Sequence, residues 1–472
     1  MENIKLFQVL GSLNREEISS LGELIKSPYF NKSRDIISLF GILKKNYPKF
    51  NNISKEKIFS ALFSHEKYKD KKLRDLFSKM LGLVEEFLTL EDLKNYPLEE
   101  MRHVLNQYSI RNLDKHYEGL TRQMQLLIDK IKVKESDYFY SSYLLKKDTR
   151  NYFEQKKTLG KRGEFDPEIN IEIDSFILFF IYKMLRYFIE QINHQKLFKH
   201  KAKLEFIEQI SGYLSVRNME SEPQVNILYT CLMMQMKPKE SHHYLNLKKL
   251  LEINRNYVNK DDLKLVYIQI YNFTREKYFG GDMELRFELF EIIKQMINLE
   301  IYPQEQGYMT SQTFINFVSA ALAVKEFEWT YNFIESFLQR VSPSHAENTY
   351  KYCMALYNYR KGSLDKALEL LAEVKIEDFY NYLRVKNHTS KIYFELGEYE
   401  SLLNLLDTFR HYLSSTDSIP EFITKRFMDF ITYLKKVVNA KLSGDEFQLK
   451  KLRDEITACH EFENRAWLLE KM

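Results

Sequence analysis

Apolar residues recur at intervals of three and four along most of the chain, the spacing that places side chains on one face of an α-helix. Near the N-terminus this pattern predicts helices over 15–26, 34–46 and 54–63, and a longer helix from about residue 70. Turn-like stretches such as SPYFN (27–31) separate these helices. No alternating pattern typical of a strand continues for more than a few residues, so we expect an all-α fold.

Helical patterns continue through the rest of the chain, with short polar breaks between them. The breaks are GKRGEFDPE (160–168), KPKES (237–241), FGGD (279–282) and YPQEQG (302–307). None of the nine prolines interrupts an apolar helical pattern, as expected if helices end before them. From this spacing we expect an N-terminal helical region over 1–96, a central helical-hairpin region over 97–310 and a repeat region over 311–472.

Two stretches near the C-terminus share one pattern. RKGSLDKALELL (360–371) returns in similar form as ELGEYESLLNLL (395–406), so that Gly362 and Gly397 recur after 35 residues. Ala355 and Ser390 each precede the corresponding glycine by seven positions. A glycine between two apolar helical patterns predicts a tight turn that joins two helices.

A third and weaker copy precedes these two. Val318, Phe327, Thr330 and Ile334 lie 37 residues before their counterparts in the copy that contains Gly362. Lys325 stands at the position of the turn glycine. An insertion of two residues accounts for the longer interval.

This register resembles the tetratricopeptide repeat (TPR), whose unit is a helical hairpin of about 34 residues. The resemblance covers about residues 311–413 of the 472 and departs from the family pattern at Lys325 and at Asn358, which replaces a tyrosine. Single hairpins of this family cannot bury their apolar faces alone, and stacking gives them a continuous core. The resemblance therefore implies a TPR-like solenoid of helical hairpins, most regular in the C-terminal third.

Five phrases spread over nearly the full length also resemble a bacterial family of all-helical proteins with no known activity. They are SPYFN (27–31), VKEFEW (324–329), DKALELL (365–371), YFELGEYESLLNLLDTF (393–409) and RAWLLEK (465–471). This resemblance supports the all-helical expectation and implies no function.

TPR arrays often hold an extended peptide in a groove lined by the first helix of each hairpin. Mapping the groove positions of the family onto this register gives Tyr352 and Tyr359 in one unit and Arg384, Asn387 and Lys391 in the next. The last three recur at i, i+3 and i+7 and so share one helix face. Such a basic, amide-bearing face is suited to an acidic side chain or a terminal carboxylate. The alternative is a solvated helix face without a ligand.

Composition narrows the class of protein. Lys and Arg total 70 against 66 Asp and Glu, a net charge of +4 that predicts no general affinity for nucleic acid or membranes. The three cysteines, Cys231, Cys353 and Cys459, form no CxxC pair, which fits a reducing, cytoplasmic compartment. The most apolar run, FILFFIYKML (176–185), is shorter than the ~20 residues that span a bilayer. We therefore expect a buried helix there and no membrane partner.

Two hypotheses are open for the N-terminal region: its basic helix binds DNA, or it only packs within the fold. In the segment 54–88, a helix, a polar turn and a basic helix could present Lys71, Lys72, Arg74 and Lys79 to a major groove. The same basic helix has a broad apolar face, which a packed helical hairpin requires. A second basic stretch, 146–162, contains aromatic residues suited to stacking on bases, or it is a solvated surface.

No catalytic or cofactor motif is found. The sequence lacks GxxxxGK[ST], GxGxxG, GxSxG and HExxH. Glu100 with His103 and Glu240 with His243 have the Glu-x-x-His spacing of di-iron bundles, but such sites also need carboxylates from two further helices. We expect no metal site and no cofactor.

Together these patterns favour a non-enzymatic protein–protein interaction scaffold or adaptor in the cytoplasm. Its partner would be a protein or peptide, with an acidic segment suited to the predicted groove residues, and nucleic acid is disfavoured. One alternative is a DNA-binding transcriptional regulator with an N-terminal helix-turn-helix-like segment and a TPR-like sensor array. A second alternative is a metal-dependent helical enzyme.

Overall fold

A computed structural model describes residues 4–50, 53–157, 168–198, 203–217, 219–279, 281–416, 419–459 and 462–472. These described residues form 23 α-helices and only two short strands, so the all-α expectation is confirmed. The chain divides into two compact units, Met1–Phe180 and Ile181–Met472. This border coincides with neither 96/97 nor 310/311, and the three-part division remains an interpretation. The polar break expected at 160–168 lies outside the described residues, apart from Glu168.

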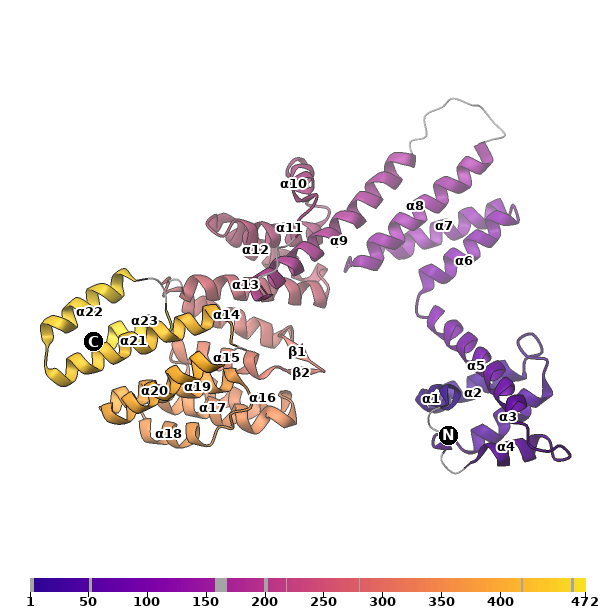
Figure 1. Ribbon diagram of the computed structural model, residues 1–472. Helices are drawn as coiled ribbons and strands as arrows, with labels where there is room; N and C mark the ends of the chain where they lie inside the picture. Colours follow the sequence, from indigo (N-terminus) through magenta and orange to yellow (C-terminus); the bar gives the residue numbers. More distant parts are fainter. Residues whose placement is uncertain are drawn as a thin grey trace. The chain divides into compact units, whose positions relative to one another are not determined.

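The first unit is built from consecutive helices (Figure 1). They are α1 (Lys5–Ser12), α2 (Arg15–Lys26), α3 (Arg34–Lys45), α4 (Lys55–Leu62), α5 (Asp70–Leu93), α6 (Pro97–Ile110), α7 (Asp114–Asp129), α8 (Ser136–Lys157) and the first part of α9 (Glu168–Phe198). The expected N-terminal helices agree with α2 to α5 to within about one residue, the usual uncertainty of helix ends.

Helices α1 to α5 enclose a core of their own. The side chain of Asn14 accepts hydrogen bonds from the backbone N–H groups of Glu16 (2.8 Å) and Glu17 (2.9 Å), and Glu17 accepts one in return from the backbone of Asn14 (2.6 Å). This capping box satisfies backbone donors that the first turn of α2 leaves free. The apolar face of α5 is buried in this core, including Leu73 and Met80.

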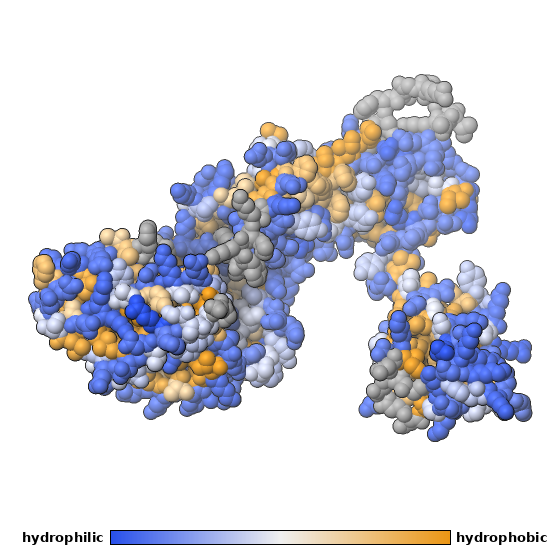
Figure 2. All heavy atoms as spheres, in the orientation of Figure 1, coloured by the Kyte–Doolittle hydropathy of each residue, from blue (hydrophilic) through white to orange (hydrophobic). Residues whose placement is uncertain are grey.

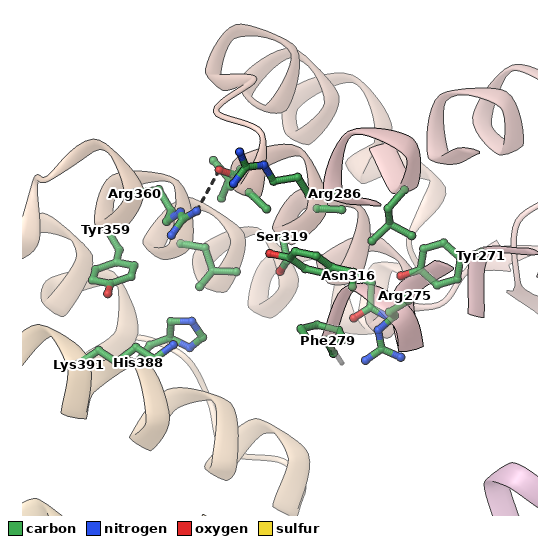
Figure 3. Close-up of a pocket in the computed structure, with 16 residues that line it drawn as sticks. Tyr271, Arg275, Phe279, Arg286, Asn316, Ser319, Tyr359, Arg360, His388 and Lys391 are labelled. Carbon is green, nitrogen blue, oxygen red and sulfur yellow. Dashed lines mark hydrogen bonds between the residues drawn. The ribbon is translucent and has the colours of Figure 1, made fainter. Parts of the chain in front are cut away.

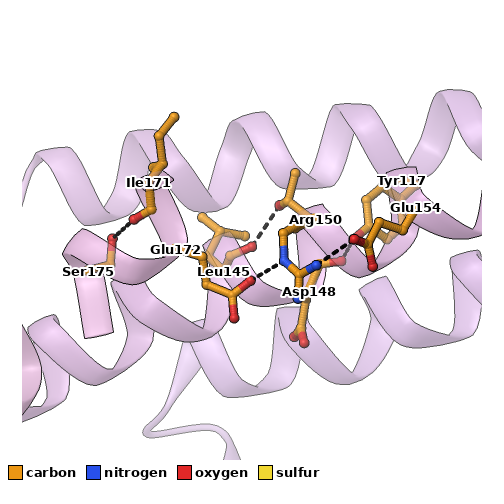
Figure 4. Close-up of polar contacts among 9 residues, drawn as sticks. Tyr117, Leu145, Asp148, Arg150, Glu154, Ile171, Glu172 and Ser175 are labelled. Carbon is orange, nitrogen blue, oxygen red and sulfur yellow. Dashed lines mark hydrogen bonds and ion pairs between the residues drawn. The ribbon is translucent and has the colours of Figure 1, made fainter. Parts of the chain in front are cut away.

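Helices α6, α7 and α8 pack around a second, more polar cluster. The rings of Tyr117 and Tyr152 stack with centroids 3.6 Å apart. Arg150 of α8 pairs with Glu154 on its own helix and with Glu172 of α9 (Figure 4). These contacts tie α7, α8 and the start of α9 together within the first unit.

The second unit continues as helical hairpins. Its elements are the remainder of α9, α10 (Ile207–Val216), α11 (Pro223–Met236), α12 (Ser241–Asn254), η2 (Arg255–Tyr257), α13 (Lys260–Phe279), α14 (Leu285–Asn298), β1 (Gln304–Glu305), β2 (Tyr308–Met309), α15 (Ser311–Ala323), α16 (Phe327–Phe337), η3 (Leu338–Arg340), α17 (Pro343–Lys361), α18 (Leu364–Ala372), α19 (Phe379–Leu396), α20 (Tyr399–Ser415), α21 (Glu421–Ser443), α22 (Glu446–Ala458) and α23 (Arg465–Lys471). The strands β1 and β2 form a two-residue antiparallel pair. From α11 to α22, each helix contacts its partner in the hairpin, and successive hairpins contact one another.

The four hairpins between residues 311 and 458 each turn through a residue with positive φ. The turns contain Lys325 (φ 64°), Gly362 (φ 85°), Gly397 (φ 76°) and Gly444 (φ 68°). In each, the N–H of the following residue donates a hydrogen bond to the carbonyl five residues earlier, as in the bond from the Ser363 N–H to the Asn358 carbonyl (2.9 Å). Glycine adopts this left-handed conformation at little cost, whereas Lys325 adopts it with strain.

The recurring positions of the repeat lie in the core. Ala355, Ser390, Thr330, Ala367 and Leu402 are at most 1% exposed. The small side chains of Ala355 and Ser390 are on the first helices of their hairpins, and Ala367 is on a second helix. The shared sequence pattern therefore marks positions where helices approach closely, and burial explains why they are small or apolar.

Hydrophilic residues cover most of the surface visible in Figure 2, with smaller apolar patches between them. Within the part of the chain that the structure describes, every helix falls short of the length and apolarity that crossing a membrane demands. The apolar run at 176–185 lies within α9, but the prediction of a buried helix is only partly right: Phe176 is 48% exposed and Phe180 38%, whereas Ile181, Tyr182 and Leu185 are buried.

Candidate functional site

The second unit contains a hollow of about 240 Å³ at the surface of five helices, α13, α14, α15, α17 and α19 (Figure 3). It is lined by Tyr271, Arg275, Tyr278, Phe279, Arg286, Leu289, Asn316, Ser319, Ala320, Leu322, Ala323, Leu356, Tyr359, Arg360, His388 and Lys391. This set of residues is called the hollow below. Four of the five helices are the first helices of their hairpins.

The repeat register explains how three of the lining residues come together. Ser319, Leu356 and Lys391 each directly follow the small or branched residue that recurs on the first helix, and all three line the hollow. Because the hairpins repeat, the same position on successive first helices faces the same side. The side chain changes from hydroxyl to apolar to cationic along this row, so the hollow is chemically mixed.

Four cationic side chains reach the hollow: Arg275, Arg286, Arg360 and Lys391. No acidic residue belongs to its described lining. None of the four cations forms an ion pair with another described residue. The only hydrogen bond among them to described groups is that from Arg360 to the Leu322 carbonyl (3.3 Å), drawn in Figure 3.

Two of the arginines are held by aromatic rings. The guanidinium carbon of Arg286 lies 4.9 Å from the ring centroid of Phe287, and that of Arg275 lies 5.3 Å from the centroid of Phe279. The Nε of Arg286 is buried and has no hydrogen-bond acceptor among the described residues. A buried donor without an acceptor costs free energy, which a ligand oxygen would recover.

The lining histidine is neutral at physiological pH. His388 Nδ1 lies 3.0 Å from the Tyr352 hydroxyl and 3.1 Å from the Arg384 carbonyl. Burial, with a further contribution from the Lys391 charge, lowers the pKa of the His388 imidazole to about 3. His388 therefore adds a polar edge to the hollow and leaves its charge to the lysine and the arginines.

Burial disfavours the charged form of Lys391. Burial lowers the pKa of its ammonium group to about 8, although Glu463 acts in the opposite direction. The ammonium nitrogen lies 5.7 Å from the ring centroid of Trp467. Lys391 remains mostly protonated at neutral pH, and an anion in the hollow would stabilise its charged form.

The C-terminal helix α23 covers the neighbouring part of α19. Glu395 accepts hydrogen bonds from the Tyr359 hydroxyl (2.7 Å) and the Trp467 indole (2.9 Å) and pairs with Lys471 (3.1 Å). Burial alone would raise the pKa of the Glu395 carboxyl, but these donors outweigh burial and hold the pKa below its usual value. This carboxylate is fully engaged by its own chain.

The five predicted groove residues fall into three groups. Tyr359 and Lys391 line the hollow. Tyr352 and Asn387 are buried, where Tyr352 bonds to His388 and the Asn387 amide oxygen accepts a hydrogen bond from Asn464 of the segment that leads into α23. Arg384 donates a hydrogen bond to Gln312 of α15 and does not line the hollow. The helix face shared by these residues is therefore used partly by the protein itself.

Sequence reasoning missed Arg275, Arg286, Arg360 and His388. Arg360 lies in the last turn of α17, directly before the repeat glycine region, and His388 lies one turn before Lys391. Both signals were present in the register of the repeat. Arg275 and Arg286 belong to the α13–α14 hairpin, where no clear repeat copy marks the groove side.

The cations proposed for DNA contact lie on α5, and two of them are paired. Lys72 pairs with Glu66 (2.6 Å) and Arg74 with Asp70 (2.8 Å). In the other basic stretch, residues 158–162 lie outside the described part of the chain. Its Tyr152 is buried against Tyr117 and is not available for base stacking.

One cluster of metal-ligating side chains occurs among the described residues. It joins Glu240, His242 and His243 at the start of α12, with His243 Nε2 3.2 Å and His242 Nε2 3.8 Å from Glu240 Oε2. Glu240 and His242 are exposed, and Glu240 also pairs with Lys237 (3.5 Å). Glu100 and His103 belong to no such cluster within the described ranges.

Comparisons of the chain with protein-family models, with curated proteins and with solved structures found no match.

Proposed function

We propose that the second unit is a TPR-like solenoid and that the protein is a non-enzymatic scaffold or adaptor, which binds an acidic segment of a partner protein in the hollow. The observation that carries this proposal is the presence of Arg275, Arg286, Arg360 and Lys391 in the lining of one hollow, without an ion-pair partner among the described residues.

Uncompensated cations that line one hollow are unfavourable in an unliganded protein. Burial removes part of the hydration of Lys391, and like charges repel. Charge-assisted hydrogen bonds from arginine and lysine to a carboxylate are about twice as strong as neutral ones, so an acidic segment would gain most where these donors are unpaired. Apolar walls such as Phe279, Leu289 and Leu356 would contribute contact area.

This proposal has more support than the DNA-binding alternative. Lys72 and Arg74 of α5 are paired with carboxylates of their own segment, whereas the cations of the hollow are not. A cytoplasmic setting is part of the proposal, since all three cysteines are free thiols and two of them are buried.

The test is affinity capture from the native lysate with two matched variants. The hollow variant carries Arg286→Gln and Arg360→Gln. The outer variant carries Lys366→Gln and Lys450→Gln, two exposed cations on α18 and α22. Both variants lose two positive charges, but only one loses them from the hollow.

We expect the wild type and the outer variant to retain the same partner protein and the hollow variant to lose most of it. Retention should weaken as salt is raised, because the contacts are ionic. Equal retention by both variants, at equal melting temperature, would show that the partner binds elsewhere.

A further inference from the structure

The charge of the hollow exceeds what one carboxylate can neutralise. Four cations line it, and the acidic groups that influence Lys391 are engaged: Glu395 by three donors, and Glu463 by Arg426 at 3.4 Å. A single carboxylate would leave a surplus of three positive charges. A phosphorylated side chain carries a charge of about −1.5 to −2 at pH 7 and presents three strong acceptor oxygens.

We propose that the partner segment carries a phosphorylated side chain and that its phosphoryl group binds between Arg286 and Arg360, whose guanidinium groups lie toward the same end of the hollow in Figure 3, while Arg275 and Lys391 line the remainder of the hollow. This inference rests on the proposed function and specifies the chemistry of its ligand. It is favoured by the number of cations and by the kind of donor they present.

The donors suit a phosphoryl group. Guanidinium groups offer planar pairs of N–H donors that match phosphate oxygens, and three of the four cations are arginines. The Nε of Arg286 has no acceptor among the described residues, and the only described acceptor of Arg360 is one backbone carbonyl. Most guanidinium N–H groups of these two arginines therefore have no described acceptor and could bind one tetrahedral anion. Asn316 and Ser319, labelled between the arginines in Figure 3, add neutral polar groups.

The walls suit the stem that carries the phosphoryl group. Tyr271, Phe279, Leu289 and Leu356 give the hollow an apolar and aromatic lining beside its cations. A ring that enters with its phosphoryl group leading would contact these walls while the oxygens reach the cations. Phenyl phosphate is therefore a minimal probe, and benzoate is its matched control, since it has the same ring but a single negative charge.

The experiment is isothermal titration calorimetry of the full chain with phenyl phosphate, benzoate and inorganic phosphate at pH 7.5. We expect phenyl phosphate to bind at least ~10-fold more tightly than benzoate and than inorganic phosphate. The hollow variant should lose at least ~10-fold in affinity for phenyl phosphate, and the outer variant should bind as the wild type does. Lys391→Met serves as a second binding variant, because its unbranched side chain preserves packing.

Equal affinity for phenyl phosphate and benzoate, or unchanged phenyl phosphate binding in both the hollow variant and Lys391→Met, would overturn the proposal. Inorganic phosphate binding as tightly as phenyl phosphate would also overturn it, because the site would then recognise a free anion.

Phosphatase treatment of the lysate separates this inference from the scaffold function. We expect the treatment to abolish capture of the partner. Capture that survives it leaves the scaffold function standing and contradicts the phosphoryl ligand. Phenyl phosphate binding in the hollow with no protein captured would contradict the scaffold function instead.

Discussion

Lys391 and Glu395 lie one turn apart on α19, and their surroundings compensate charge in opposite ways. Glu395 receives hydrogen bonds from Tyr359 and Trp467 and an ion pair from Lys471. Lys391 has no ion pair with a described residue and faces the hollow beside Arg360. The chain's own C-terminal helix thus covers one end of this helix face, while the other end keeps a surplus of positive charge.

The difference shows why residue type alone does not identify a binding position. Both residues are charged and partly buried on the same helix. A buried charge whose partners are all within its own chain contributes to stability, whereas an uncompensated one is retained at a cost in stability. Costs of this kind concentrate at functional sites, so the open end is the better candidate for ligand contact.

The largest loss of stability is expected from disrupting the packing of the C-terminal hairpins, to which Lys391 and Glu395 belong. Ala367 of α18 is fully buried, so Ala367→Asp would place an unpaired carboxylate between packed helices. We expect a loss of more than about 4 kcal/mol and unfolding of the C-terminal hairpins, measured by chemical denaturation. Lys366→Asp, at the exposed neighbouring position, is the control, and a similar loss there would argue against a specific effect of burial.

A smaller loss of stability is expected where α23 covers α19. Trp467→Ala removes the indole that donates to Glu395 and packs against Phe394 with ring centroids 5.5 Å apart. We expect a destabilisation of about 2 to 3 kcal/mol, below the usual range for a fully buried tryptophan. Phe447→Ala on α22, where the ring is 79% exposed, should change stability little. Equal effects of the two substitutions would show that α23 does not stabilise α19.

Lowering the pH should destabilise the protein through His388, which lines the hollow. The pKa of His388 is about 3 in the folded protein against an ordinary value of 6.5, so the unfolded chain binds an extra proton between these values. Stability from this group is present above pH 6.5 and is lost as pH falls toward 3, with a slope of at most ~1.4 kcal/mol per pH unit. His388→Gln should flatten the slope of the free energy of unfolding, and His411→Gln, at an exposed position, should not. An unchanged slope in His388→Gln would mean that the imidazole is protonated in the fold.

The smallest expected effect is an increase in stability. Lys391→Met removes an ammonium group whose pKa is lowered by burial, so we expect the melting temperature without ligand to rise by ~1 to 2 °C. The same substitution should weaken phenyl phosphate binding. Lys366→Met on the outer surface should change neither quantity. A fall in melting temperature would identify Lys391 as a structural residue.

The regular helices and their turns were predictable from sequence because they depend on local spacing. Gly362 and Gly397 predicted two turns, and both glycines have positive φ in the structure. Lys325 adopts the same conformation without glycine, so only its register revealed that turn. Gly444 ends a further helix in the same way, but it lies 47 residues after Gly397 and was missed because the interval had changed.

The candidate site was less predictable because tertiary contacts decide which groove residues are free. Asn387 shares the helix face of Lys391, yet its amide oxygen accepts a hydrogen bond from Asn464. Nothing in the spacing of α19 shows that the C-terminal segment returns to it. Arg286 could not be placed either, since its hairpin lacks a clear copy of the repeat. Periodicity predicts which face of a helix is apolar, and only the packed structure shows which charges remain uncompensated.

The most direct test of the uncompensated cations is quantitative lysine labelling of Lys391 as a function of pH, with and without phenyl phosphate. Without ligand we expect Lys391 to react with an apparent pKa of about 8, against an ordinary 10.5, and phenyl phosphate should protect it and shift this value upward. Labelling that is the same with and without phenyl phosphate, or that has the ordinary lysine pKa, would contradict the assignment of the hollow as an anion-binding site.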